Sequence, residues 1–201
     1  MKIDKKTYAL KEDNYIQQEF KKRQIIVGST GRKDMLHYGS WIYRHNGKYK
    51  KTSTFTIDKK GNIFQHYNPK YYSKFIGKVQ DKASISISMV NEGWLDLDSM
   101  HGRYIDWLGN IYNKDEEVVT KKWRNHLYWM SYTKEQIESL KFLVTYLTEE
   151  YNIPKNILNH NAYYEDVDLF DGIVYRSNYL EEVSDITPAF NIAELKKIEN
   201  E

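Results

Sequence analysis

The six histidines of this chain are the side chains best suited to bind a metal or to move a proton, and none stands in a known metal-binding pattern. They lie at positions 37, 45, 66, 101, 126 and 160, with no HExxH or HxH pair among them. The chain has no cysteine, which excludes disulfides, thiolate metal ligands and cysteine nucleophiles. Any metal site must therefore combine His, Asp and Glu residues from separate segments.

The segment IIVGSTG, residues 25–31, has the pattern of a buried strand that ends in a loop. Three β-branched apolar residues are followed by GSTG, which breaks the run. Strand ends of this kind often present catalytic side chains, but position 28 is a glycine. Ser29 has no GxSxG context, and the segment lacks the GxxxxGK[ST] spacing of a phosphate loop. Neither a serine-hydrolase elbow nor a nucleotide site is indicated.

Three further segments have clear local patterns. Residues 52–67 contain two apolar runs around DKKG, which predicts a β-hairpin. Residues 83–90, ASISISMV, alternate apolar and serine side chains, which predicts a strand with one buried face. Residues 133–154 have helical spacing, with a capping box from Thr133 to Gln136 and a proline at the end.

Length and composition indicate one folded domain. The 201 residues are 40% hydrophobic and 29% charged, with a formal net charge of +2, which excludes a disordered chain and gives no electrostatic footprint for nucleic acid. We expect an α/β (α+β) single domain in which a central, mostly β-sheet is flanked by helices. The expected division is an N-terminal arm (1–22), a main domain (23–192) with insertions at about 94–131 and 162–183, and a C-terminal tail (193–201).

The sequence also bears on localisation. No apolar run approaches 18 residues, and the first 15 residues lack the apolar core of a signal peptide. We therefore expect a soluble protein without a membrane span, cytoplasmic at synthesis.

The order of these segments resembles that of the zinc-dependent N-acetylmuramoyl-L-alanine amidases, whose fold is shared by phage lysozymes of the amidase type and by peptidoglycan recognition proteins. IIVGST stands where that family reads like IVLHHT, TFTIDKKGNIFQ where it reads like HYVIDRDGKIYQ, and SISISMVNEG where it reads like SIGIELVNEG. YTKEQ, NH and DITPAF then follow in the family's order. The resemblance covers roughly residues 24–92 and 132–192.

The resemblance implies a catalytic Zn²⁺ with three protein ligands and a water in the fourth position. Carried over residue by residue, the ligand positions fall on Gly28, His160 and Asp185. Glycine has no side chain, so the ligand set is incomplete, and His37 and His66 are the candidates for the third ligand.

The assisting positions of the family are altered too. Its tyrosine falls on Ser53 and its glutamate on Ser88. Serine without a partner is a poor general base, so no catalytic residue is assigned and the enzymatic status stays open. Trp94 and Asn161, together with Arg176, are candidates for substrate binding.

Three functions follow from the resemblance. The first is an amidase that hydrolyses the muramoyl–L-alanine bond of peptidoglycan. The second is a catalytically inactive module that binds peptidoglycan or muropeptide. The third is a structural protein of a phage particle or cell envelope that uses the fold to bind a protein partner.

Overall fold

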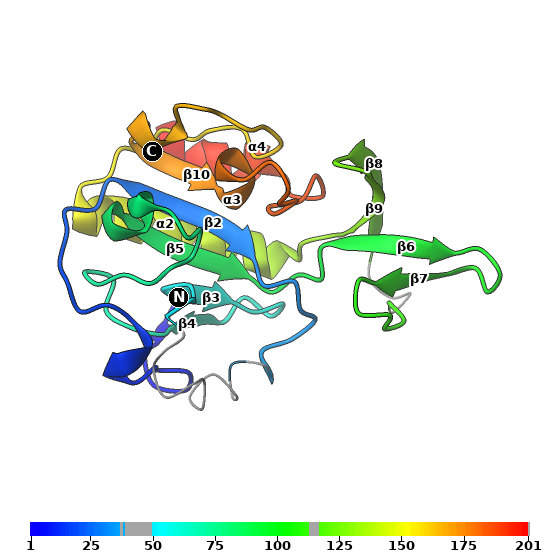
Figure 1. The fold of residues 1–201 in the computed structure, drawn as a ribbon, viewed down its shortest axis with the longest axis horizontal. Helices are drawn as coiled ribbons and strands as arrows, with labels where there is room; N and C mark the ends of the chain where they lie inside the picture. Colours follow the sequence, from blue (N-terminus) through cyan, green and yellow to red (C-terminus); the bar gives the residue numbers. More distant parts are fainter. Residues whose placement is uncertain (37, 39–49, 113–116, 201) are drawn as a thin grey trace.

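The computed structural model describes residues 1–36, 38, 50–112 and 117–200, and its main body is a six-stranded sheet flanked by helices (Figure 1). The order of strands across the sheet is β1-β4-β3-β5-β2-β10. Their bounds are β1 Ile3–Asp4, β2 Gln24–Ser29, β3 Phe55–Ile57, β4 Ile63–Gln65, β5 Ser84–Met89 and β10 Gly172–Tyr175. The mixed α+β architecture with a central sheet confirms the expected fold class.

The four strands β3, β5, β2 and β10 run parallel, so their carboxyl ends lie at one edge of the sheet. β3 and β4 form the antiparallel hairpin that the DKKG segment predicts. In α/β sheets, ligands bind outside the carboxyl ends of parallel strands, and that edge is therefore where a site is expected.

Helix α2 (Lys134–Tyr151) covers one face of the sheet. Thr133 and Gln136 form the predicted capping box, in which the Thr133 hydroxyl accepts from the Gln136 N–H and the Gln136 side chain accepts from the Thr133 N–H. Leu140, Val144 and Leu147 of this helix are fully buried against the sheet. Helix α4 (Ile192–Lys196) and the 3-10 turn Lys197–Asn200 complete this layer.

The alternation along β5 predicts one buried face, but the structure buries both. All six residues of this strand are buried, serines included. The reason is that β5 is an inner strand whose serines find partners: the Ser86 hydroxyl accepts from the Thr54 N–H, and the Ser84 hydroxyl donates to the Gln80 carbonyl. Small hydroxyl side chains can be buried when their hydrogen bonds are satisfied.

Residues 94–112 and 117–130 form a second sheet that projects from the body (Figure 1). Its strand order is β7-β6-β9-β8, all antiparallel. The bounds are β6 Trp94–Asp98, β7 Arg103–Asp106, β8 Val118–Trp123 and β9 His126–Met130. Leu95, Tyr112 and Met130 form a small buried core of its own.

The turn between β8 and β9 connects this inserted sheet to the C-terminal part of the main body. Arg124 and Asn125 at the turn have φ of 45° and 67°, the left-handed values that tight hairpin turns require. The Arg124 guanidinium donates to the backbone carbonyls of Leu180, Val183 and Ser177. The Arg124 side chain therefore links the two segments expected as insertions, 94–131 and 162–183.

The C-terminal part of the main domain contains strand β10, which the sequence patterns did not predict. GIVY is only four residues long, and it is recognisable as a strand through its pairing with β2. It is followed at once by the short helix α3 (Arg176–Tyr179). Within the expected N-terminal arm, β1 pairs with β4, and a 3-10 turn covers Glu12–Asn14. Two further 3-10 turns cover Val79–Ala83 and Val167–Leu169.

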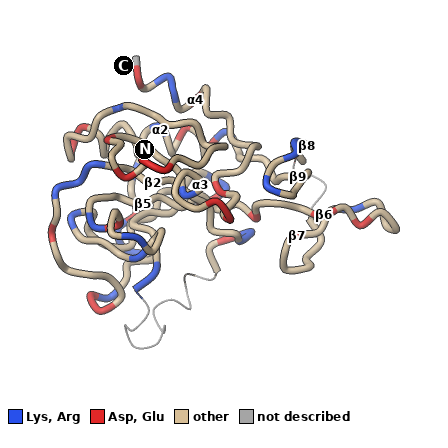
Figure 2. Tube along the Cα trace, turned by 45° about the horizontal axis from the view of Figure 1, so that its top comes forward, with Lys and Arg blue, Asp and Glu red and all other residues tan. Residues whose placement is uncertain are grey.

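Charged residues of both signs are distributed over the body and the inserted sheet (Figure 2). In the described part of the chain, no helix has the length and apolar character needed to cross a membrane.

Candidate functional site

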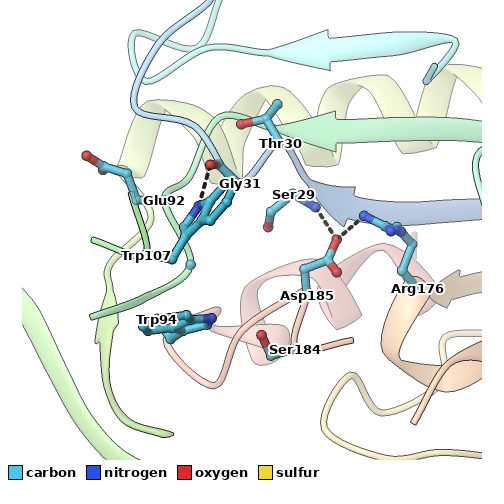
Figure 3. Close-up of a pocket in the computed structure, with 10 residues that line it drawn as sticks. Ser29, Thr30, Gly31, Glu92, Trp94, Trp107, Arg176, Ser184 and Asp185 are labelled. Atoms are coloured by element: carbon cyan, nitrogen blue, oxygen red, sulfur yellow. Dashed lines mark hydrogen bonds and ion pairs between the residues drawn. The ribbon is translucent and has the colours of Figure 1, made fainter. Parts of the chain in front are cut away.

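A pocket of about 300 Å³ opens at the carboxyl end of β2, between the main sheet and the inserted sheet (Figure 3). Its location is the one expected from the parallel strand ends. Three successive residues after the β2 core, a pair of tryptophans from the inserted sheet and the Asp185 loop contribute most of its lining. The lining residues are Ser29, Thr30, Gly31, Glu92, Gly93, Trp94, Trp107, Arg176, Ser184 and Asp185.

The inner wall of the pocket is an ion pair. Arg176 Nη1 lies 3.1 Å from Asp185 Oδ2, and the same oxygen accepts the Ser29 N–H at 2.6 Å (Figure 3). The two side chains are only 21% and 13% exposed. A charge-assisted hydrogen bond and an ion pair therefore meet on one carboxylate oxygen in a site with little water.

Gly28 lies directly behind this ion pair, and its backbone is not in the left-handed region. A Cβ built on Gly28 would lie 2.5 Å from Arg176 Cδ and 2.7 Å from Asp185 Oδ2. Glycine is thus required here for space and not for conformation. The space in front of the family's first ligand position is filled by the Arg176 side chain and the Asp185 carboxylate.

His160 is buried, with its ring 5.8 Å from that of Tyr175 and 5.7 Å from that of Phe190. Burial, with smaller contributions from Lys121 and Lys196, lowers the pKa of His160 to about 4. The imidazole is therefore neutral near pH 7. Its Nε2 atom is buried and has no hydrogen-bond partner among the described residues. A neutral imidazole with a free nitrogen is the form that binds metals.

Of the two candidates for the third metal ligand, the structure describes His66 but not His37. His37 lies outside the described residues. His66 is buried, and both of its ring nitrogens are hydrogen-bonded, Nε2 to the Thr56 hydroxyl at 2.8 Å and Nδ1 to the Tyr8 carbonyl at 2.9 Å. Its ring also stacks on Tyr38 at 4.5 Å. Neither nitrogen is left to face the ion pair.

The two serines at the assisting positions are buried in the sheet. Ser88 lies on β5 in register with Gly28 on one side and Thr56 on the other. Ser53 lies 3.3 Å from the Thr56 hydroxyl. Neither serine lines the pocket. Ser53 thus faces the Thr56 hydroxyl, and Ser88 lies within the sheet between Gly28 and Thr56.

The described residues do not fit a zinc ion of the family type. Among residues 1–36, 38, 50–112 and 117–200, no group of three His, Asp or Glu side chains is placed to hold a metal. Asp185 is paired with Arg176, position 28 has no side chain, and His66 is satisfied elsewhere. Zinc sites need three or four convergent ligands, so this set falls short.

The outer wall of the pocket comes from the inserted sheet. Trp94 stacks on His126, with ring centroids 4.3 Å apart and planes 11° from parallel. Trp107 donates its indole N–H to the Gly31 carbonyl at 2.8 Å, and the Arg32 guanidinium lies 5.0 Å above its ring. Both indoles are thus held in fixed orientations.

Sequence reasoning selected Trp94, Arg176 and Asn161 as substrate-binding candidates, and the structure places the first two at the pocket but Asn161 outside its lining. It overlooked Trp107, which lies in the same aromatic segment as Trp94. A signal was available in the sequence, because Trp107 belongs to the same Trp- and Tyr-rich segment, and aromatic side chains with a polar tip suit binding surfaces.

Comparisons with known proteins agree with the fold. LysC, an N-acetylmuramoyl-L-alanine amidase from Clostridium intestinale URNW, is 16% identical over 100% of this chain and 98% of its own, with a TM-score of 0.59. A mutant endolysin from Bacillus subtilis is 16% identical over 92% and 90%, with a TM-score of 0.53. PlyL is 13% identical over 92% and 86%, with a TM-score of 0.55. At these identities the likeness concerns the fold. No curated protein sequence matches the chain.

The family comparison reaches further than the structural one. Residues 19–169, about three quarters of the chain, match the N-acetylmuramoyl-L-alanine amidase family. The matched range contains strands β2 to β9, helix α2 and His160, and it ends before Arg176 and Asp185. The chain belongs to the N-acetylmuramoyl-L-alanine amidase family.

Proposed function

We propose that this protein is a peptidoglycan-directed member of the amidase family that binds muropeptide in the pocket between β2 and the inserted sheet without zinc-dependent hydrolysis. The observation that carries the proposal is the side chain of Arg176, which fills the space in front of Gly28 and pairs with Asp185. A metal-bound water would have to be generated in that space.

The pocket has the features that binding a muropeptide requires. Trp94 and Trp107 offer apolar ring surface suited to a sugar ring. Ser29, Thr30 and Ser184 add hydroxyl groups to the lining. Pockets that bind small ligands combine apolar lining with a few polar groups that fix orientation, and about 300 Å³ lies at the lower end of their usual size.

Retention on insoluble peptidoglycan tests the binding half of the proposal. The wild-type protein should sediment with purified peptidoglycan, and Trp107→Ala should lower its affinity by about tenfold, the effect of losing one stacking contact of about 1.4 kcal/mol. Tyr146→Ala is the matched control, since Tyr146 is an exposed aromatic on α2 that does not line the pocket. Wild-type protein that stays in the supernatant would refute binding.

Hydrolysis is measured in the same samples by the release of new amino groups, with and without added zinc. We expect none from wild-type protein in either condition. Zinc-dependent release of amino groups that is lost in His160→Ala would instead establish the ordinary amidase reaction and overturn the proposal.

The biological setting belongs to the same proposal. A phage-associated or cell-envelope protein is consistent with relatives that are titled endolysins. Co-purification with phage particles or with the cell envelope would test it.

A further inference from the structure

Strand β10 determines which residue stands next to Gly28. β10 pairs with β2 in parallel register, with Val174 opposite Ile26 and Tyr175 opposite Val27. The residue that follows β10 is Arg176, and the residue that follows Val27 is Gly28. The register therefore delivers an arginine side chain to the position where the family has its first metal ligand.

The Arg176 side chain passes closely over the Gly28 backbone. A Cβ at position 28 would lie 2.5 Å from Arg176 Cδ and 3.0 Å from Cγ, so the aliphatic part of the arginine lies where a side chain at position 28 would begin. The guanidinium then lies 5.2 Å from the Phe75 ring centroid and reaches the Asp185 carboxylate. Gly28 and Arg176 are sterically coupled. The arginine side chain leaves no room for a Cβ at position 28, and the glycine leaves the space that the arginine side chain occupies.

We propose that the Arg176 guanidinium takes the place of a metal ion beside Asp185. Its permanent positive charge pairs with the carboxylate, so that the site keeps its structure without zinc. A guanidinium stays protonated at all pH values a protein meets, and it neutralises the carboxylate without needing a third ligand. A zinc ion, in contrast, would need Asp185 free of its partner and a side chain at position 28.

The proposal makes His160 and Asp185 a latent pair of ligands. His160 keeps a buried, unpartnered Nε2, which no group in the described residues uses. Asp185 is reached by Arg176 and by the Ser29 N–H. Removing the guanidinium frees the carboxylate, and placing an imidazole at position 28 supplies the ligand that is missing.

Metal titration of four proteins tests this proposal. The set is the wild type, Arg176→Lys, Arg176→Ala and the double variant Gly28→His/Arg176→Ala, all prepared without a polyhistidine tag. Binding of Zn²⁺ is followed by calorimetry and metal analysis, and binding of Co²⁺ by its visible absorption, which reports the ligand geometry. Circular dichroism establishes that each variant is folded.

We expect the wild type and Arg176→Lys, which retain the cation, to bind no stoichiometric zinc. Arg176→Ala should gain affinity by about tenfold because the Asp185 carboxylate is freed, and the double variant should gain more because it has one ligand more. Adding His160→Ala to the double variant should abolish the gain. If the double variant does not fold, Arg176→Ala alone still tests the proposal, because this substitution removes side-chain atoms and adds none.

Two results would overturn the proposal. One is a wild-type protein that binds one zinc per chain and loses it in Asp185→Ala. The other is a folded Arg176→Ala protein whose zinc affinity equals that of the wild type. The inference rests on the zinc-independent half of the proposed function, but a failure to bind peptidoglycan leaves the metal titration unchanged, so the two failures can be told apart.

Discussion

Two arginine–aspartate pairs lie at opposite ends of the neighbouring strands β2 and β10, and they have very different surroundings. At the amino ends, Arg23 pairs with Asp171 at 2.6 Å, and the two side chains are 45% and 43% exposed. At the carboxyl ends, Arg176 pairs with Asp185 at 3.1 Å, with exposures of 21% and 13%. The chemistry is the same at both ends.

The outer pair (Arg23–Asp171) and the inner pair (Arg176–Asp185) differ in the groups that surround them. Asp185 also accepts the Ser29 N–H, and Arg176 lies over a glycine, so the inner pair is part of the packing of the sheet edge. The outer pair is solvated and contributes little, as exposed pairs usually do. The comparison teaches that an ion pair becomes structural when other buried groups depend on it.

The largest effect should come from removing each acid in turn. Asp185→Ala leaves a partly buried guanidinium and the Ser29 N–H without their partner, and we expect it to lower the free energy of unfolding by about 3 kcal/mol. Asp171→Ala at the outer pair should cost less than about 1 kcal/mol. Urea denaturation with unchanged m-values measures both. Equal losses would remove the distinction between the two ends.

The next effect concerns the glycine under the inner pair. Gly28→Ala forces its new Cβ against Arg176 Cδ and the Asp185 carboxylate, and we expect a loss of about 2 kcal/mol from overpacking. In an Arg176→Ala background the aliphatic clash disappears, so the alanine should cost distinctly less there. A double-mutant cycle measures this coupling, and additive losses would show that the two positions are independent.

Lys22, the buried cation that precedes Arg23 in the sequence, extends the comparison to the pH dependence of stability. Its ammonium donates to the carbonyls of Tyr71 and Lys82, and burial lowers its pKa to about 8. Between pH 8 and 10.5 the unfolded chain binds more protons at this residue than the folded chain, so its contribution to stability rises with pH. The slope is at most about 1.4 kcal/mol per pH unit. Stability curves of wild type and Lys22→Met should diverge in that window, and parallel curves would contradict the assignment.

The smallest effect should come from the support of the inner pair by the inserted sheet. Arg124→Ala removes donors to the carbonyls of Leu180, Val183 and Ser177 in the segment that leads to Asp185. We expect a loss of about 1 kcal/mol, since Leu180 and Val183 are only partly buried and their freed carbonyls can bind water. Faster amide exchange at residues 177–185 would show where the loosening occurs. Exchange that increases uniformly over the main sheet would argue against a local role.

Much of the fold followed from local patterns. The strand at 24–29, the hairpin around DKKG and the capped helix from Thr133 each have a period or a cap that a short window contains. β10 does not, because four residues carry too little periodicity and its stability comes from pairing with β2. For the same reason the sequence did not predict the strands of the aromatic segment 94–130. In the described residues these strands pair with one another, and a short window of sequence does not contain that pairing.

The sequence by itself determined that a glycine stands at 28, a histidine at 160 and an aspartate at 185, the positions to which the resemblance carries the zinc ligands. It also determined that no cysteine could stand in for the missing ligand. Only the tertiary structure decided what replaces that ligand. Arg176 is 148 residues from Gly28, and its place over the glycine depends on the register of two paired strands, a long-range property that residue types and spacing do not contain.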